Sequence, residues 1–379
     1  MVGLQPTMQS THPNKDDDIV AAVAIFIVAV VGIVTNGMSA FTIFKMEHLR
    51  NAFGYSCASH AFGNLGVLFI FAFWAAPLLI LQHHLIQEIH GYKFLSDTAG
   101  QLTIVFYYAG IYTNILITMN RCFIITWPAL YQKYFNTSMT LRWIVLIWTI
   151  AFIQSCIYQF PGCHFYFDSQ SYTWTYSASE CGYAISTFFE CSLNSFAVIF
   201  IISMDSFIFY RLRCMHKALL ISGSNAISVT EQQQRRKREI RFFLQACCSE
   251  SLYLFAVANF YGFVQLSRSK WATFILTTMV WELFHTVDGI ILVAFNRDVR
   301  FCCHKKAAKK SEKTIEKTAM PICSRRPKPT KRASPLTMVS GGGLVRNVVG
   351  PVSNQLRLDA IVESHNKKCD QAGILISTS

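Results

Sequence analysis

The chain has 379 residues, of which 52% are apolar and only 15% are charged. Charged residues make up roughly 25% of a typical soluble domain, so the composition excludes two or three ordinary soluble domains. Thirteen cysteines are too sparse in a chain of this length for a small disulfide-rich secreted framework. The net charge of +13 would suit nucleic-acid binding on a folded surface, but half of the 34 Lys and Arg residues lie beyond Asn296. These features indicate a membrane protein with a basic tail.

Seven stretches are long and apolar enough to cross a bilayer, which takes roughly 20 residues of helix. We place them near residues 19–44, 55–81, 99–123, 143–161, 185–209, 242–266 and 272–295. Only the last three contain acidic residues. The first stretch is too long for the apolar core of a signal peptide, and it follows the acidic segment KDDD (15–18), so we interpret it as an uncleaved signal anchor. The predicted fold is an all-α, seven-transmembrane helix bundle like that of a G-protein-coupled receptor.

The distribution of Lys and Arg predicts how the bundle is oriented. Predicted loops on the side of the amino terminus carry four of these residues, whereas the opposite loops carry thirteen before the tail is counted. Residues 1–18 are therefore expected outside the cell, residues 19–303 form the seven-helix domain, and residues 304–379 form a cytoplasmic tail. The tail is basic and shows no sustained helical period, so we expect it to be disordered. This orientation disfavours seven-span odorant channels of the insect type, whose amino terminus lies inside.

A motif typical of G-protein-coupled receptors stands at the inner end of the third span, in LITMNRCFIITWPALYQKYF (116–135). Arg121 can reach the membrane interface and pair with acids of neighbouring helices. Asn120 stands where rhodopsin-like receptors usually have an acid, so any ionic latch must reach another helix. We assign Asn120, Arg121, Pro128 and Tyr131 to G-protein coupling. An ordinary topology anchor is the alternative for Arg121.

A second basic group precedes the sixth span, in EQQQRRKREIRFFLQACC (231–248). A basic stripe that extends a helix below the bilayer suits an acidic partner surface, although the positive-inside rule explains part of it. We add its four members to the coupling set: Arg235, Arg236, Lys237 and Arg238.

Five acidic residues fall inside the last three spans, which contain no Lys or Arg. Burying an ionisable group in a membrane is costly, so these acids are functional candidates, with a neutral structural carboxyl as the alternative for each. The three in the inner half are expected to form a water-filled switching network with two asparagines: Asn36, Asn64, Asp205, Glu250 and Asp288. The two that lie farther out are expected to face a ligand beside nearby aromatic and imidazole groups: Tyr107, Tyr108, Glu190, Trp281, Glu282 and His285.

An enzymatic function is the main alternative. Glu282, His285 and Asp288 recur every third residue and share one helical face, so with His60 they could ligate zinc, as in seven-span lipid hydrolases. A zinc site needs three or four converging ligands, and only two mid-span imidazoles are available. A channel or transporter is disfavoured because the sequence shows neither internal repeats nor a polar filter. We expect no enzymatic activity, no metal and no cofactor.

The sequence resembles a family of nematode chemosensory receptors. The stretch REIRFFLQACCSESLYLFAVANFYGFVQLSRSKWATFILTTMVWELFHTVDGIILVAFNRDVR (238–300), the MNRC and WPALYQKYF segments and PGCHFYFDSQSYTWTYSASECG (161–182) together resemble serpentine receptors of class X. The resemblance covers residues 25–303. It departs from the family pattern at Cys122, where an aromatic residue is expected. The sixth and seventh spans also contain no proline, so the rhodopsin-family hinges are missing.

The resemblance implies a seven-helix chemoreceptor in the plasma membrane of ciliated sensory neurons. Its partners would be a heterotrimeric G protein, a small-molecule or peptide chemical cue, and membrane lipid, but no nucleic acid. The ligand and the class of G protein are not indicated.

Two cysteine pairs carry specific predictions. Only Cys163 and Cys181 fall on the predicted extracellular side, where oxidation is favoured. The outer end of the third span, SDTAGQL (96–102), has no cysteine that could tether the second outer loop. We therefore predict a disulfide between Cys163 and Cys181 that pins this loop as a lid over the pocket. Adjacent Cys302 and Cys303 follow the last span beside basic residues and suit S-palmitoylation, with two free thiols as the alternative.

Overall fold

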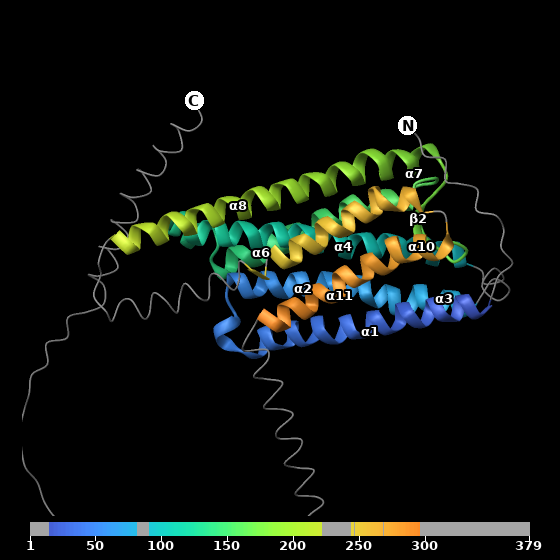
Figure 1. The fold of residues 1–379 in the computed structure, drawn as a ribbon, viewed down its shortest axis with the longest axis horizontal. Helices are drawn as coiled ribbons and strands as arrows, with labels where there is room; N and C mark the ends of the chain where they lie inside the picture. The colour runs from blue at the N-terminus through green and yellow to red at the C-terminus, as the bar shows by residue number, and fades with distance from the viewer. Residues whose placement is uncertain (1–14, 82–90, 222–243, 246, 268, 296–379) are drawn as a thin grey trace, which may run out of the picture. The chain divides into compact units, whose positions relative to one another are not determined.

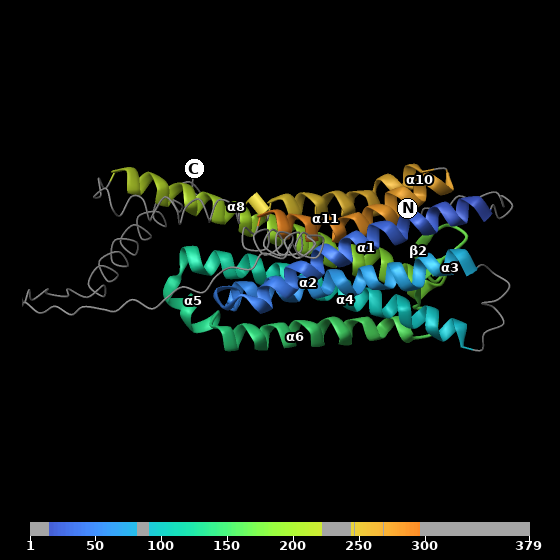
Figure 2. The same ribbon diagram turned by 90° about the horizontal axis from the view of Figure 1, so that it is seen from below.

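The computed structural model describes residues 15–81, 91–221, 244–245, 247–267 and 269–295. By its internal contacts the chain divides into two compact units, residues 1–213 with 224–305 and residues 214–223 with 306–379. The first unit is a bundle of helices that lie side by side, with a small β-hairpin at one end (Figures 1 and 2). The predicted division into a short outer terminus, a seven-helix domain and a tail stays a prediction.

Six helices in the described part of the chain are long and apolar enough to cross a membrane: Lys15–Lys45, Ala52–Leu81, Tyr92–Thr126, Thr137–Gln159, Glu180–Met215 and Lys270–Phe295. The remaining predicted span is helical over residues 247–261, which we call the sixth helix. Every predicted span therefore corresponds to a helix, as the predicted bundle requires. Several helices are longer than predicted, because hydropathy marks only their apolar part. Helix α4 begins at Tyr92 rather than near residue 99.

Most membrane-crossing helices are built from more than one element. In chain order, the elements before the hairpin are α1 (Lys15–Lys45), η1 (Glu47–Leu49), α2 (Ala52–Ile70), η2 (Phe71–Ala75), α3 (Ala76–Leu81), α4 (Tyr92–Thr126), α5 (Pro128–Tyr134), α6 (Thr137–Ser155) and η3 (Cys156–Gln159). After the hairpin come α7 (Glu180–Ala184), η4 (Ile185–Glu190), α8 (Cys191–Ile221), the sixth helix, η5 (Phe263–Leu266), α10 (Lys270–Phe274), η6 (Ile275–Met279) and α11 (Val280–Phe295).

Three of the short segments are π-helical: η2, η4 and η6. Each interrupts a membrane-crossing helix toward the end that is predicted to lie outside. A π-helical turn is rare, changes which side chains face the interior, and often marks a functional site. Glu190 is the last residue of η4, so this interruption sets the direction of a buried acid.

The hairpin lies in the loop between the fourth and fifth membrane-crossing helices. Strand β1 (Phe165–Asp168) pairs antiparallel with β2 (Thr173–Tyr176), and Phe167 stands opposite Trp174. Because side chains alternate across a strand, one face of β1 is buried in the bundle, with Phe165 and Phe167 at most 2% exposed. The backbone of this strand lies directly on α4: a Cβ added to Gly100 would stand 1.6 Å from the Phe165 carbonyl oxygen.

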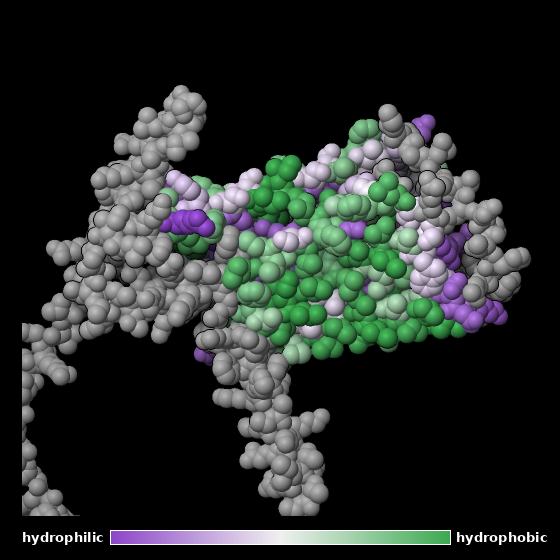
Figure 3. Space-filling model, viewed as in Figure 1, coloured by the Kyte–Doolittle hydropathy of each residue, from purple (hydrophilic) through white to green (hydrophobic). Residues whose placement is uncertain are grey.

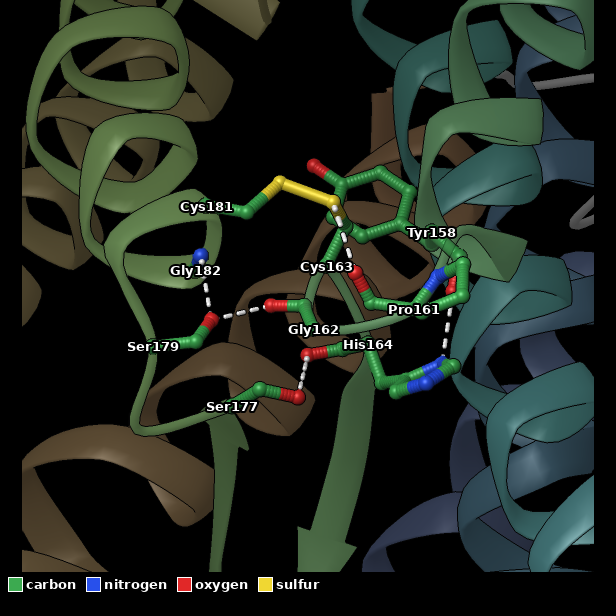
Figure 4. Close-up of a disulfide and its surroundings, with 9 residues drawn as sticks. All are labelled: Tyr158, Pro161, Gly162, Cys163, His164, Ser177, Ser179, Cys181 and Gly182. Carbon is green, nitrogen blue, oxygen red and sulfur yellow. Dashed lines mark hydrogen bonds between the residues drawn. A yellow bond between two sulfur atoms is a disulfide. The ribbon is translucent and has the colours of Figure 1, made fainter.

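A disulfide between Cys163 and Cys181 closes the base of the hairpin loop, which confirms the predicted pairing (Figure 4). Hydrogen bonds hold the same base. The Ser179 hydroxyl donates to the Gly162 carbonyl and accepts from the Gly182 N–H at 3.1 Å (Figure 4). The loop is therefore fixed to the start of α7 by both covalent and polar contacts.

The tip of the hairpin is fixed to two helices through Tyr172. Its hydroxyl donates to Asp18 at the start of α1, and Lys270 Nζ lies 3.4 Å from the centre of its ring. Thr278 Oγ1 donates to its carbonyl oxygen at 2.7 Å. Tyr172 has a φ of 60°, which is unfavourable for a side chain of this size. Such a conformation persists because the surrounding contacts determine it.

The middle of the bundle has an apolar outer surface. In the face shown by Figure 3, hydrophobic side chains cover the length of the helices, and hydrophilic ones gather toward the ends. Large apolar side chains such as Phe73, Val145 and Ile153 are more than 60% exposed. Water would oppose this exposure, whereas lipid tails favour it. The protein therefore crosses the membrane several times.

Candidate functional site

A buried polar network surrounds Asp288 on α11. Its carboxylate accepts hydrogen bonds from His60 Nε2 and Asn64 Nδ2 on α2, the latter at 3.0 Å, and from Ser249 Oγ on the sixth helix. His60 Nδ1 lies 3.1 Å from the Gly110 carbonyl oxygen, which can only accept. A protonated His60 beside an ionised Asp288 therefore satisfies every one of these bonds. Three membrane-crossing helices meet at this carboxylate.

The network extends to α1 through two asparagines. Asn64 Nδ2 lies 3.2 Å from Asn36 Oδ1, and Asn36 Nδ2 donates to the His285 carbonyl at 3.1 Å. Asn64 Oδ1 accepts from His285 Nδ1 at 2.8 Å, so that nitrogen carries a proton. The other ring nitrogen, Nε2, is buried without a hydrogen-bond partner. His285 therefore joins the network on one side and presents a bare acceptor on the other.

The predicted switching network is only partly brought together. Asn36, Asn64 and Asp288 are joined as described above. No hydrogen bond in the described part of the chain links Asp205 or Glu250 to them. These two acids lie instead close to each other and within electrostatic range of Arg121. The position of a residue in its span predicts how deep it lies in the membrane, but not which way its side chain points around the helix. The side-chain directions separate these five residues into two groups.

Arg121 lies on α4, and its guanidinium stands 5.5 Å from the centre of the Phe53 ring. Its Nε has no hydrogen-bond partner, and neither oxygen of Asp205 has one. Among the described residues, no ion pair joins Arg121 to Asp205 or Glu250, although its charge acts on both. Arg121 is thus held close to two acids without a direct bond.

The other predicted coupling residues divide between described and undescribed segments. Asn120 is 2% exposed, and Tyr131 lies beside it. Pro128 is exposed at the first position of the short helix α5, none of whose residues is buried. The basic residues of the third cytoplasmic loop and Cys302 with Cys303 lie outside the described residues.

An aromatic cluster surrounds Glu190, which is 2% exposed. Tyr108 of α4 and Tyr158 of η3 both donate to its carboxylate. One turn away, Asn194 Oδ1 accepts from Tyr107 and from Tyr253 of the sixth helix, each at 2.7 Å. The predicted ligand residues Tyr107, Tyr108 and Glu190 therefore lie together. The sequence interpretation did not select Tyr158, Asn194 or Tyr253, although polar groups inside apolar spans were the available signal.

Trp281 joins the hairpin to this aromatic cluster. Its ring centre lies 5.5 Å from that of Tyr107, 6.2 Å from that of Trp174 and 6.4 Å from that of His285. Its Nε1 is buried without a hydrogen-bond partner. A cavity of about 10 Å³, enough for roughly one water molecule, lies beside Tyr107 and His285. The aromatic contacts leave little free space between hairpin and network.

The residues considered for zinc do not converge. His60 binds Asp288, and His285 binds Asn64. Glu282 is fully buried, and neither of its carboxylate oxygens has a hydrogen-bond partner among the side chains. Within the described residues, no group of three His, Cys, Asp or Glu side chains is arranged to hold a metal ion.

Comparison with known proteins places the chain in a family. The sequence model of the "Serpentine type 7TM GPCR chemoreceptor Srx" family matches residues 26–296. The chain belongs to this family. It is therefore a seven-transmembrane chemoreceptor of the G-protein-coupled-receptor type, and the resemblance to class X found in the sequence is confirmed.

Two relatives come from Caenorhabditis elegans. "Serpentine receptor class X 45" is 27% identical over 314 residues, which cover 79% of this chain and 85% of the relative. "Serpentine receptor class X-43" is 23% identical over 193 residues, which cover 49% and 57% of the two chains. Among solved structures, squid rhodopsin superposes with a TM-score of 0.62 at 14% identity, over 85% of this chain and 97% of that one. This similarity confirms the predicted fold.

Proposed function

We propose that this Srx protein binds an external chemical cue in the outer half of the bundle and activates a heterotrimeric G protein at its cytoplasmic end. The family and the rhodopsin-like fold support a receptor of this type. The small-molecule or peptide cue would contact the aromatic cluster and its neighbours: Tyr107, Tyr108, Glu190, Trp281, Glu282 and His285. The plasma membrane of sensory neurons is the expected location.

The proposal rests on the contacts of two adjacent residues of the sixth helix, Ser249 and Glu250. Ser249 binds Asp288, which belongs to the network that reaches His285 and Trp281. Glu250 is the next residue of the helix, and the positive charge of Arg121 acts on its carboxyl group. A shift of the sixth helix therefore changes a contact to the Asp288 network and a contact to the coupling residue together. A ligand that binds one position of the helix more tightly would shift the population toward it.

At the cytoplasmic end, we assign the contact with the G protein to Arg121 with Asn120, Pro128 and Tyr131. In the resting state the charge of Arg121 stabilises Asp205 and Glu250 near the membrane. When the sixth helix moves away, Arg121 becomes available to the G protein. The basic loop residues, Arg235, Arg236, Lys237 and Arg238, would contact an acidic surface of the same partner.

The test measures nucleotide exchange on purified G protein with the receptor in nanodiscs, and it needs no known ligand. Glu250→Gln removes an acid that holds the resting state, so basal exchange should rise. Adding Arg121→Ala to that variant should return exchange to the level of empty nanodiscs. Arg142→Ala is the control, because this exposed arginine lies at the same end of the bundle on α6. Undiminished exchange in the double variant would leave Arg121 as a topology anchor only.

A further inference from the structure

A second cavity, of about 400 Å³, opens at the outer end of the bundle between the start of α4 and the hairpin. Its size falls in the range of small-molecule sites. None of the predicted ligand residues lines it. Its wall consists of Leu78, Tyr92, Lys93, Ser96, Asp97, His164, Tyr166, Phe167, Asp168, Ser169, Gln170 and Ser177.

Asp97 is the most deeply buried charged group in this wall, at 8% exposure. Its Oδ2 lies 3.3 Å from His164 Nδ1, and the same nitrogen lies 3.1 Å from the Tyr158 carbonyl oxygen. A carbonyl oxygen can only accept, so Nδ1 carries the proton in the neutral ring as well. The Nδ1–H of His164 therefore faces both the Asp97 carboxylate and the Tyr158 carbonyl oxygen.

Asp168, at the end of β1, brings a second carboxylate to the wall. It accepts from the N–H groups of Gln170 and Ser171 at 3.1 and 3.2 Å, and from the Ser171 hydroxyl at 2.6 Å. These donors are neutral. Lys93 is the cation in the wall, and it is exposed, so water screens its charge more than that of the buried Asp97.

Both carboxylates act on the Tyr166 hydroxyl. Burial, then the charge of Asp168, then that of Asp97 raise the pKa of Tyr166 above its ordinary value. The rings of Tyr92 and Tyr166 supply aromatic surface in the same wall. Carboxylates beside aromatic rings are the combination that attracts organic cations, through charge and through the ring faces.

We propose that this outer cavity binds the ammonium group of a small organic amine, and that the amine is the cue of the proposed receptor. The proposal rests on the proposed function, and it adds the class of ligand and the first place of contact. The hairpin connects the cavity to the bundle, because Tyr166 and Asp168 alternate along β1 with Phe165. The Phe165 ring lies 5.5 Å from Trp174 and 6.2 Å from Trp281, which contacts the network.

The experiment measures the charge preference of the cavity with thiol reagents. Ser169→Cys places a thiol in the wall, and Ala178→Cys places one on an exposed part of the same loop. Both are made in a Cys156→Ser background, because Cys156, the first residue of η3, is a free, half-buried thiol at the outer end of the same membrane-crossing helix. The probes are a trimethylammonium-ethyl and a sulfonatoethyl methanethiosulfonate. One uncompensated charge close to the thiol should make the cation-to-anion rate ratio about fivefold higher at residue 169 than at residue 178.

Charge variants and protection sharpen this test. Asp97→Asn and Asp168→Asn should each lower the ratio at residue 169, and Lys93→Gln should raise it. Phenylethylammonium at millimolar concentration should slow labelling at residue 169, whereas phenylpropionate, of matched shape and opposite charge, should not. Equal ratios at the two positions, or equal effects of the two compounds, would overturn the proposal.

The labelling experiment contains no G protein. It therefore tests the amine site independently of the proposed receptor function. Cation-selective labelling without nucleotide exchange would keep the amine site and refute the proposed function. Nucleotide exchange without cation selectivity would keep the receptor function and refute the amine site.

Discussion

Strand β1 lies so close to α4 at Gly100 that the substitution Gly100→Ala tests whether the hairpin loop is packed on this helix. A Cβ at this position would stand 1.6 Å from the Phe165 carbonyl oxygen and 2.6 Å from its carbon. A Cβ atom essentially never lies closer than 3.0 Å to another heavy atom that is not bonded to it, so the strand must move by about 1.4 Å. It cannot move freely, because the disulfide holds its base and Tyr172 holds the tip of the hairpin.

The expected cost follows from the kind of atom that is displaced. Overpacking costs typically about 1–3 kcal/mol, and a displaced backbone belongs at the upper end. The higher helix propensity of alanine offsets about 0.5–1 kcal/mol of this loss in the free energy of unfolding. The net loss is about 2 kcal/mol, which corresponds to a melting temperature about 4–8 °C lower.

The assay is thermal denaturation of the purified receptor, followed by tryptophan fluorescence. Gly110→Ala is the matched control on the same helix, because a Cβ there meets nothing within 4 Å. It should keep or slightly raise the melting temperature. If the two variants have the same melting temperature, β1 does not lie on α4 as described.

Three further predictions concern the disulfide, the buried pair and lipidation. Cys163→Ser with Cys181→Ser should lower stability by about 3 kcal/mol for the 18-residue separation, measured as a fall in melting temperature, and peptide mapping of the non-reduced parent should find the bond. Asp288→Asn should destabilise the bundle by about 3 kcal/mol, because it leaves the buried charge of His60 without an opposite charge; adding His60→Gln should recover part of the loss in a double-mutant cycle, and strict additivity would contradict the pairing. Cys302→Ser with Cys303→Ser should remove acyl-exchange labelling, and unchanged labelling would exclude palmitoylation there.

The sequence predicts the features that the membrane imposes. Lipid requires apolar runs of helical length, so the seven spans are visible directly. The Cys163–Cys181 bond is predictable because only these two cysteines lie in an outer loop. The hairpin was missed, although FYFD and TWTY alternate around a polar turn, as strands do.

Side-chain directions were less predictable. Asp288 and Asp205 lie at similar depths, yet one binds His60 and the other lies near Arg121. Rotation about a helix decides this, and the π-helical segments alter that rotation. The outer cavity was also missed, because its wall combines the start of α4 with a hairpin that was expected only as a loop.

The π-helical segments have a consequence for how such receptors can diverge. In an α-helix, gaining or losing one residue turns everything on one side of the change by about 100°. A π-helical turn is a place where a helix already accommodates such a change. The π-helical segments η2, η4 and η6 lie toward the outer ends of their helices. Gaining or losing a residue in one of them would therefore reorient the short outer segment next to it, α3, α7 or α10. The inner halves, with the residues assigned to coupling, would stay in register. Recognition of new cues could then evolve while the signalling half of the molecule is inherited unchanged.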